Sequence, residues 1–174
     1  ALPAADAFSP PLGTVPLDAA ACHDIDAMSD VVVDDRPHAH EHSLEVQLPF
    51  LQQVLGAFSL VPFSVGDASV AEVAEVIELL WGGEETLFVI SSDLSHYYDY
   101  ETARRLDAAT TRAIEALDPS GLDSESACGR VPVRGFLDCA RRHGLRARTL
   151  DLRNSGDTAG SREQVVGYGA YAFA

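Results

Sequence analysis

The fold of this chain is decided by one stretch, Leu87-Phe88-Val89-Ile90-Ser91-Ser92-Asp93-Leu94-Ser95-His96. Its first four residues are a short apolar run of the kind that forms a fully buried strand, and we predict a strand over 86–90. A helical pattern resumes near Tyr100, so the polar residues between them occupy a turn. In open α/β sheets, turns at the carboxyl ends of parallel strands carry the chemistry. We therefore expect Asp93 and His96 to lie in a functional site.

Strand and helix patterns alternate on both sides of this stretch. The period of the apolar residues predicts strands over 58–65, 146–153 and 165–173, and helices over 18–28, 67–81, 101–117 and 132–143, with a further helix after Glu41 that Pro49 interrupts. Such alternation is typical of an α/β fold. The two C-terminal strands are consecutive, so we expect them to form an antiparallel pair at one edge of the sheet.

Composition limits the class of protein. A length of 174 residues predicts one domain, and 47% apolar residues suffice for a buried core. The net charge of −15 argues against nucleic acid or an anionic membrane as the main partner. Three cysteines without paired spacing do not form a disulfide framework, which favours a reducing, cytoplasmic setting. No apolar stretch reaches about 18 residues, so we expect no membrane span.

A histidine-rich segment, His38-Ala39-His40-Glu41-His42, precedes the stretch by about fifty residues. Imidazole is a favoured ligand of divalent transition metals. For His38 and His40 a solvated polar loop is the simpler interpretation. His42 is the better candidate, because it adjoins an amphipathic helical pattern and has Glu45 one turn further on.

The Asp93-x-Ser95-His96 motif pairs a carboxylate with an imidazole. A carboxylate can hold histidine in one tautomer and raise its basicity, which suits the ring to general base catalysis or to metal ligation. The alternative is a capping turn, in which Ser92 or Asp93 caps the next helix and His96 is incidental.

A single cysteine, Cys128, stands in the segment Ala127-Cys128-Gly129-Arg130. A thiolate is a strong ligand for zinc or iron, and the alternative is an inert buried thiol. Arg130 fits either an anion-binding role or an ordinary surface position. Cys139 falls within an amphipathic helical pattern, where we expect it in the core.

Taken together, three motifs resemble the Memo family, whose microbial members are called AmmeMemoRadiSam system protein B. They are Glu41-His42-Ser43-Leu44-Glu45-Val46-Gln47-Leu48-Pro49-Phe50-Leu51, then Ser91-Ser92-Asp93-Leu94-Ser95-His96-Tyr97, then Cys128-Gly129-Arg130 followed by Pro132. Their order and spacing agree across nearly the whole chain. The resemblance implies the fold of the class III extradiol dioxygenases, an α/β fold in which a central mixed, mostly parallel sheet is flanked by helices and has a metal pocket at one end.

The resemblance also implies site roles. His42 and Cys128 would be metal ligands, with the thiolate replacing the carboxylate ligand of the related dioxygenases, and Asp93 and His96 would form the acid/base pair. The cofactor would be a divalent metal, with iron first and zinc or copper as alternatives. The family has a further metal-binding histidine in an N-terminal His-Ala-Gly-Tyr segment, to which nothing here corresponds. We therefore predict one Memo-like domain over 1–174 that lacks the family's N-terminal strand and first metal-binding histidine. An upstream segment, a partner or a second copy would complete it.

Two functions follow as hypotheses. The first is an iron-dependent redox or dioxygenase-type enzyme, an oxidoreductase acting on a small-molecule or peptide ligand that the sequence does not identify. The second is a non-catalytic binding or partner module, which the resemblance places beside a radical enzyme. A zinc hydrolase is a third option, because zinc accepts the same ligands.

Overall fold

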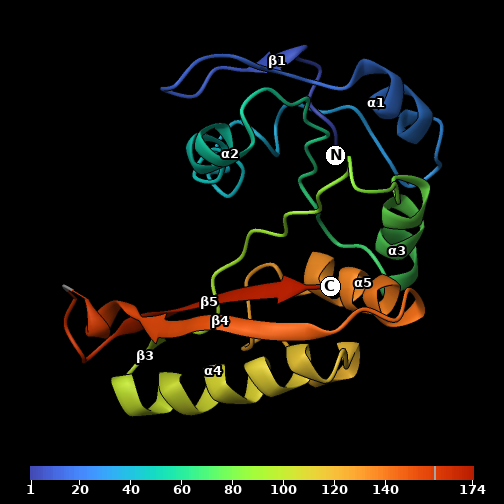
Figure 1. The fold of residues 1–174 in the computed structure, drawn as a ribbon. Helices are drawn as coiled ribbons and strands as arrows, with labels where there is room; N and C mark the ends of the chain where they lie inside the picture. Colours follow the sequence, from blue (N-terminus) through green and yellow to red (C-terminus); the bar gives the residue numbers. More distant parts are fainter. Residues whose placement is uncertain (159) are drawn as a thin grey trace. The chain divides into compact units, whose positions relative to one another are not determined.

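The computed structural model describes residues 1–158 and 160–174. The chain divides into two compact units, Ala1–Asp67 (unit 1) and Ala68–Ala174 (unit 2), each described below by itself (Figure 1). Helices and small sheets occur along the chain, which confirms the α/β class. The prediction of a single domain stays a prediction.

Unit 1 contains two short strands and two helices, β1 (Ala7–Phe8), β2 (Val15–Pro16), α1 (Ala19–Asp26) and α2 (Leu48–Leu55). β1 and β2 pair antiparallel. Isolated parallel bridges join Leu2 to Val33 and Leu17 to Leu60. Helix α1 begins where predicted because the Asp18 side chain accepts the Ala21 N–H at 3.1 Å, which satisfies a backbone donor that the first turn leaves free.

The segment before α2 differs from its prediction. Residues 36–40 and 43–47 form turns, and α2 begins only at Leu48. Pro49 therefore lies in the first turn, where the missing N–H has no helical partner to lose, and it opens the helix rather than interrupting it. Because 36–40 turns, His38, His40 and His42 do not share the face of an extended strand.

Unit 2 is built from a three-stranded sheet and its helices. In chain order these are α3 (Val70–Leu79), β3 (His96–Tyr98), α4 (Tyr100–Glu115), the 3-10 helix η1 (Pro119–Gly121), α5 (Arg130–Arg142), β4 (Ala147–Asn154), the 3-10 helix η2 (Ser155–Asp157) and β5 (Val165–Phe173). The strand order is β3-β5-β4 and both pairings are antiparallel. Helix α4 lies along one face of the β4–β5 pair (Figure 1). The antiparallel pair predicted from the two C-terminal strands is confirmed.

The strands predicted over 58–65 and 86–90 are not formed. Among the described residues the named strands pair only antiparallel, and a mostly parallel central sheet is not found. The physical reason is that an apolar run becomes a strand only when a neighbouring strand takes up its backbone hydrogen bonds. Residues 86–90 have no such neighbour, and Phe88 instead stacks against Trp81 with ring centroids 5.3 Å apart.

The core of unit 2 joins its helices to the sheet. Ile114 of α4, Leu122 and Leu137 of α5 form a buried cluster, against which Ala147, Tyr171 and Phe173 of the β4–β5 pair are packed. Helix α5 also approaches α3 closely at Gly135, where a β-carbon would lie 2.5 Å from the Cβ of Val73. Gly135 therefore permits a helix contact that any side chain would obstruct.

A polar contact also holds α3 to the end of α5. His143 stacks on Trp81 with ring centroids 3.8 Å apart, and its Nε2 lies 2.8 Å from Glu78 Oε2. This hydrogen bond is the main reason that the pKa of Glu78 is lowered from its ordinary 4.5. The ionised carboxylate is thus favoured in the folded state.

We expect Glu78→Gln to destabilise unit 2 at neutral pH and to have a smaller effect in acid. A carboxylate whose pKa is lowered by folding adds stability above its unfolded pKa, and this stability is lost as pH falls through the folded value. The difference between wild type and variant should therefore shrink as pH falls below about 4.5. Urea unfolding followed by the fluorescence of Trp81, the chain's single tryptophan, measures it. Glu84→Gln, at an exposed glutamate, is the control, and a difference that does not change with pH would contradict the expectation.

No helix in the described ranges has both the length and the apolar character of a membrane span. Helix α4, with 16 residues, carries polar and charged residues along most of its length. A spanning helix needs about 20 mostly apolar residues.

Candidate functional site

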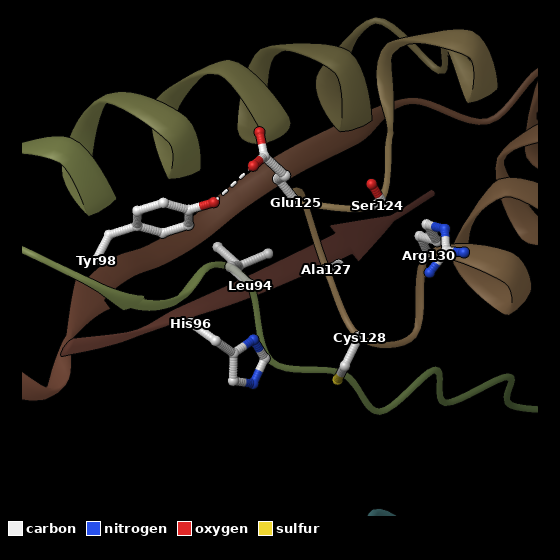
Figure 2. Close-up of a pocket in the computed structure, with 8 residues that line it drawn as sticks. All are labelled: Leu94, His96, Tyr98, Ser124, Glu125, Ala127, Cys128 and Arg130. Carbon is white, nitrogen blue, oxygen red and sulfur yellow. Dashed lines mark hydrogen bonds between the residues drawn. The ribbon is translucent and has the colours of Figure 1, made fainter. Parts of the chain in front are cut away.

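The candidate site is a cavity of about 280 Å³ in unit 2. Two segments supply its walls, residues 94–98 around β3 and residues 124–130 before and into α5 (Figure 2). The first segment contributes His96 and Tyr98, and the second contributes Glu125, Cys128 and Arg130. The structure thus brings together His96 and Cys128, which the sequence proposed from separate motifs.

His96 is positioned by backbone pairing with β5. The Leu94 N–H donates to the Gly167 carbonyl at 2.8 Å, and the Gly167 N–H donates to the Ser95 carbonyl at 2.8 Å. His96 then pairs in register with Val166, but the register shifts before Tyr98. Tyr97, at the shift, has a φ of 63°, which is a strained value for a residue with a side chain. The backbone is therefore irregular directly after the candidate acid/base residue.

Asp93 and His96 lie close, though not in hydrogen-bond contact. Asp93 Oδ2 is 3.6 Å from His96 Nε2, a separation that gives an ion pair when the ring is protonated and is too long for a direct hydrogen bond. The capping role considered for Ser92 or Asp93 is wrong, because Asp99 caps α4 by accepting the N–H groups of Glu101 and Thr102, each at 3.1 Å. The Asp93 carboxylate is therefore free of that role and stands beside the imidazole.

Cys128 is exposed, so the buried-thiol alternative is wrong for it, and the expected core position of Cys139 is confirmed. Its Sγ lies 3.5 Å from Ser92 Oγ and 3.8 Å from the Asp93 carbonyl oxygen. The same Ser92 hydroxyl accepts the Gly129 N–H at 2.8 Å and donates to the Asp93 carbonyl at 2.7 Å. Ser92 therefore ties the segment that carries His96 to the segment that carries the thiol.

Gly129 is required for this contact. A β-carbon at Gly129 would lie 2.8 Å from Ser92 Cβ and 3.3 Å from the Ser91 carbonyl oxygen. Helix α5 begins directly afterwards at Arg130. The absence of a side chain at Gly129 thus lets the thiol segment reach the histidine segment.

The remaining wall of the cavity is polar. Tyr98 donates its hydroxyl proton to Glu125 Oε1 at 2.7 Å (Figure 2). This bond is the main reason that the pKa of Tyr98 is raised, since a phenolate beside a carboxylate is disfavoured. Arg130 lines the same cavity, so its wall carries a carboxylate and a guanidinium. Sequence reasoning missed Glu125, because a glutamate in a polar loop gives no periodic signal.

His42 belongs to unit 1, where it is exposed and its backbone N–H donates to Glu41 Oε1 at 2.7 Å. Its role as a metal ligand with Cys128 stays a prediction. Within residues 1–158 and 160–174, no group of three His, Cys, Asp or Glu residues is arranged to hold a metal ion. The described residues therefore provide ligand types without a complete ligand set.

A family comparison accounts for this combination of motifs. The model of the Memo-like protein family matches residues 1–172. The chain belongs to the Memo-like family. This confirms the resemblance drawn from the three motifs, and the Memo-like match includes both segments that line the cavity.

Curated relatives are longer than this chain. A MEMO1 family protein of Aeropyrum pernix is 38% identical over 174 residues, which cover 92% of this chain and 62% of the relative. One from Ignicoccus hospitalis is 37% identical, with 94% and 62% covered. One from Thermotoga maritima is 38% identical, with 91% and 60% covered. The Memo-like region described here thus spans about 62% of the length of the first of these relatives.

Proposed function

We propose that this chain is a metal-binding Memo-like protein in which Cys128 is a metal ligand and His96 is the acid/base residue. The observation that carries the proposal is the shared cavity, where a thiol and an imidazole from two separate segments face the same space (Figure 2). His42 is the second proposed ligand, and its inclusion is supported by the family motif alone. The same proposal includes the fold that the resemblance implies for this chain, a mostly parallel, dioxygenase-like central sheet.

The ligand types fit a transition metal. Thiolate and imidazole suit iron, zinc and copper, whereas calcium and magnesium prefer oxygen ligands. The Cys128 thiol is exposed, and its nearest polar neighbours, the Ser92 hydroxyl and a backbone carbonyl, are weak partners for sulfur. Bound iron would supply redox chemistry with dioxygen, and zinc would supply Lewis acidity.

The chain's own residues would then bind the ligand and move a proton. His96 presents Nε2 beside the Asp93 carboxylate, which would orient the ring. From this atom the ring would give a proton to a bound ligand or take one from it. Glu125 and Arg130 would hold polar groups of the ligand against the wall of the cavity.

Metal content tests the proposal. The chain is loaded anaerobically with ferrous iron, passed through a desalting column and analysed for metal. We expect Cys128→Ser and His42→Ala each to lower the affinity at least about tenfold, since each removes a direct ligand. Cys22→Ser, at a cysteine of unit 1, is the matched control. Circular dichroism checks the fold, and a Cys128→Ser variant that retains as much iron as wild type would rule the proposal out.

The alternative is a binding module that uses the cavity without turnover. The observation in its favour is the polar wall, where the Tyr98–Glu125 hydrogen bond and Arg130 offer groups of both charges to a ligand. If the folded wild type takes up no iron, zinc or copper, this alternative replaces the first proposal.

A further inference from the structure

The backbone that carries His96 is held from two sides. On one side, Gly167 of β5 accepts the Leu94 N–H and donates its own N–H to the Ser95 carbonyl, each at 2.8 Å. On the other side, the Ser95 N–H turns away from β5 and donates to Asp107 Oδ1 of α4 at 3.0 Å. Asp107 thus accepts the backbone N–H of the residue directly before His96, and this N–H is not paired with a strand neighbour.

Asp107 is an unusual residue for its position. It is 2% exposed, on the inward face of α4 that also carries Ala103, Thr110 and Ile114. Its carboxylate lies against Gly167, where a β-carbon would come within 2.5 Å of Asp107 Cγ. Burying an ionisable carboxyl group costs free energy that an apolar residue or an amide would avoid. The proposed acid/base chemistry of His96 gives this carboxyl group a role.

The surroundings of Asp107 act on its ionisation. The pKa of Asp107 is raised, mainly by burial, and the hydrogen bonding from Ser95 and the nearby charge of His96 act against this rise. Tyr171 of β5 also lies near Asp107, and its pKa is raised mainly by its own burial and in part by the Asp107 charge.

We propose that Asp107 is a positioning residue for His96, which acts by holding the backbone in place at Ser95. The proposal rests on the proposed acid/base role of His96. It adds a second carboxylate to the site, because Asp93 approaches the ring from the solvent side with a side chain 48% exposed, whereas Asp107 acts from within the core. Asp107 contacts neither ligand nor metal in this proposal and acts only through His96.

Two variants separate the hydrogen bond from the charge. Asp107→Asn keeps the shape and an acceptor oxygen but removes the charge, whereas Asp107→Ala removes both. Asp138→Asn is the matched control, since Asp138 is a mostly buried aspartate of α5 whose carboxylate pairs with Arg141 and Arg142. All measurements use metal-free protein, so their outcome does not depend on whether Cys128 binds metal.

The first measurement is amide hydrogen exchange at Ser95 by NMR. In Asp107→Ala we expect this amide to exchange about tenfold faster than in wild type, relative to core amides of α4, because one hydrogen bond is lost. In Asp107→Asn the rate should return close to the wild-type value. Equal Ser95 exchange in Asp107→Ala and wild type would overturn the proposal. If Asp107→Ala does not fold, a Ser95 amide in Asp107→Asn that exchanges as fast as an unprotected amide also overturns it.

The second measurement is the rate at which His96 reacts with diethyl pyrocarbonate, which modifies histidine in its neutral form. We expect this rate in Asp107→Ala to differ at least about threefold from wild type, because the backbone that presents the ring is no longer held at Ser95, and to return close to the wild-type value in Asp107→Asn, which keeps an acceptor oxygen. Peptide mapping identifies the modified histidine. An equal rate in Asp107→Ala and wild type, or a change no larger than that in Asp138→Asn, would overturn the proposal.

Discussion

Gly167→Ala is expected to destabilise unit 2 by about 1–3 kcal/mol, although alanine suits a strand better than glycine does. Gly167 is buried in β5, and its missing side chain leaves the space that the Asp107 carboxylate fills. A methyl group there would push either α4 away from the sheet or Asp107 out of contact with Ser95. Urea unfolding followed by Trp81 fluorescence measures the loss.

The double variant Gly167→Ala/Asp107→Ala tests this cause. If the methyl group and the carboxylate compete for one space, removing the carboxylate makes room for the methyl group. The double variant should then be more stable than the sum of the single effects by about 0.5–3 kcal/mol. Strictly additive effects would show that the two residues do not share this space. The Ser95 amide exchange rate of each variant, compared with that of wild type, shows whether the disturbance reaches the turn that carries His96.

Leu137→Ala is expected to have the largest effect on stability, a loss of about 2–5 kcal/mol. Leu137 has no exposed surface and joins α5 to Ile114 of α4 in the core cluster, against which β4 and β5 are packed. Truncation leaves a cavity among three elements that the remaining backbone holds apart, so the loss exceeds the cost of the removed methyl groups alone.

Leu150→Ala is the matched control for Leu137→Ala. Leu150 lies on β4 with 59% of its surface exposed, so the same substitution there should cost no more than about 0.5 kcal/mol. Both variants are compared in one urea series with Trp81 as the reporter. Equal losses at the two positions would contradict the assignment of Leu137 to the core.

Local structure was largely predictable from the sequence. Helix α3 begins at Val70 because Ser69 and Glu72 cap each other, with Ser69 Oγ accepting the Glu72 N–H at 3.2 Å and Glu72 Oε2 accepting the Ser69 N–H at 2.6 Å. Helix α1 and the β4–β5 pair also lie close to their predicted positions. These elements depend on residues a few positions apart, which a single sequence displays directly.

The strands over 58–65 and 86–90 were not predictable in this way. Their apolar composition is that of strands, but strand formation depends on a hydrogen-bonded neighbour that composition does not reveal. An apolar or polar pattern indicates whether a segment prefers the core or the solvent, whereas the pairing of strands depends on the rest of the chain.

The sequence contains one signal that Asp107 is buried. Ala103, Asp107, Thr111 and Ile114 recur at helical spacing, so an aspartate stands on the inward stripe of α4. A charged residue on such a stripe indicates either a surface helix end or a buried group with a partner. Only the structure identifies the partner as the Ser95 N–H.

By itself the sequence determined the α/β class, the approximate positions of most helices, the C-terminal strand pair, the Memo-like family and the residue types of the candidate site. The tertiary structure alone decided that His96 and Cys128 share a cavity, that Ser92 and Gly129 join their segments, and that Asp107 accepts the backbone N–H directly before the histidine. The physical reason is that capping and periodicity act over a few residues, while burial and hydrogen-bond satisfaction depend on groups far apart in the chain.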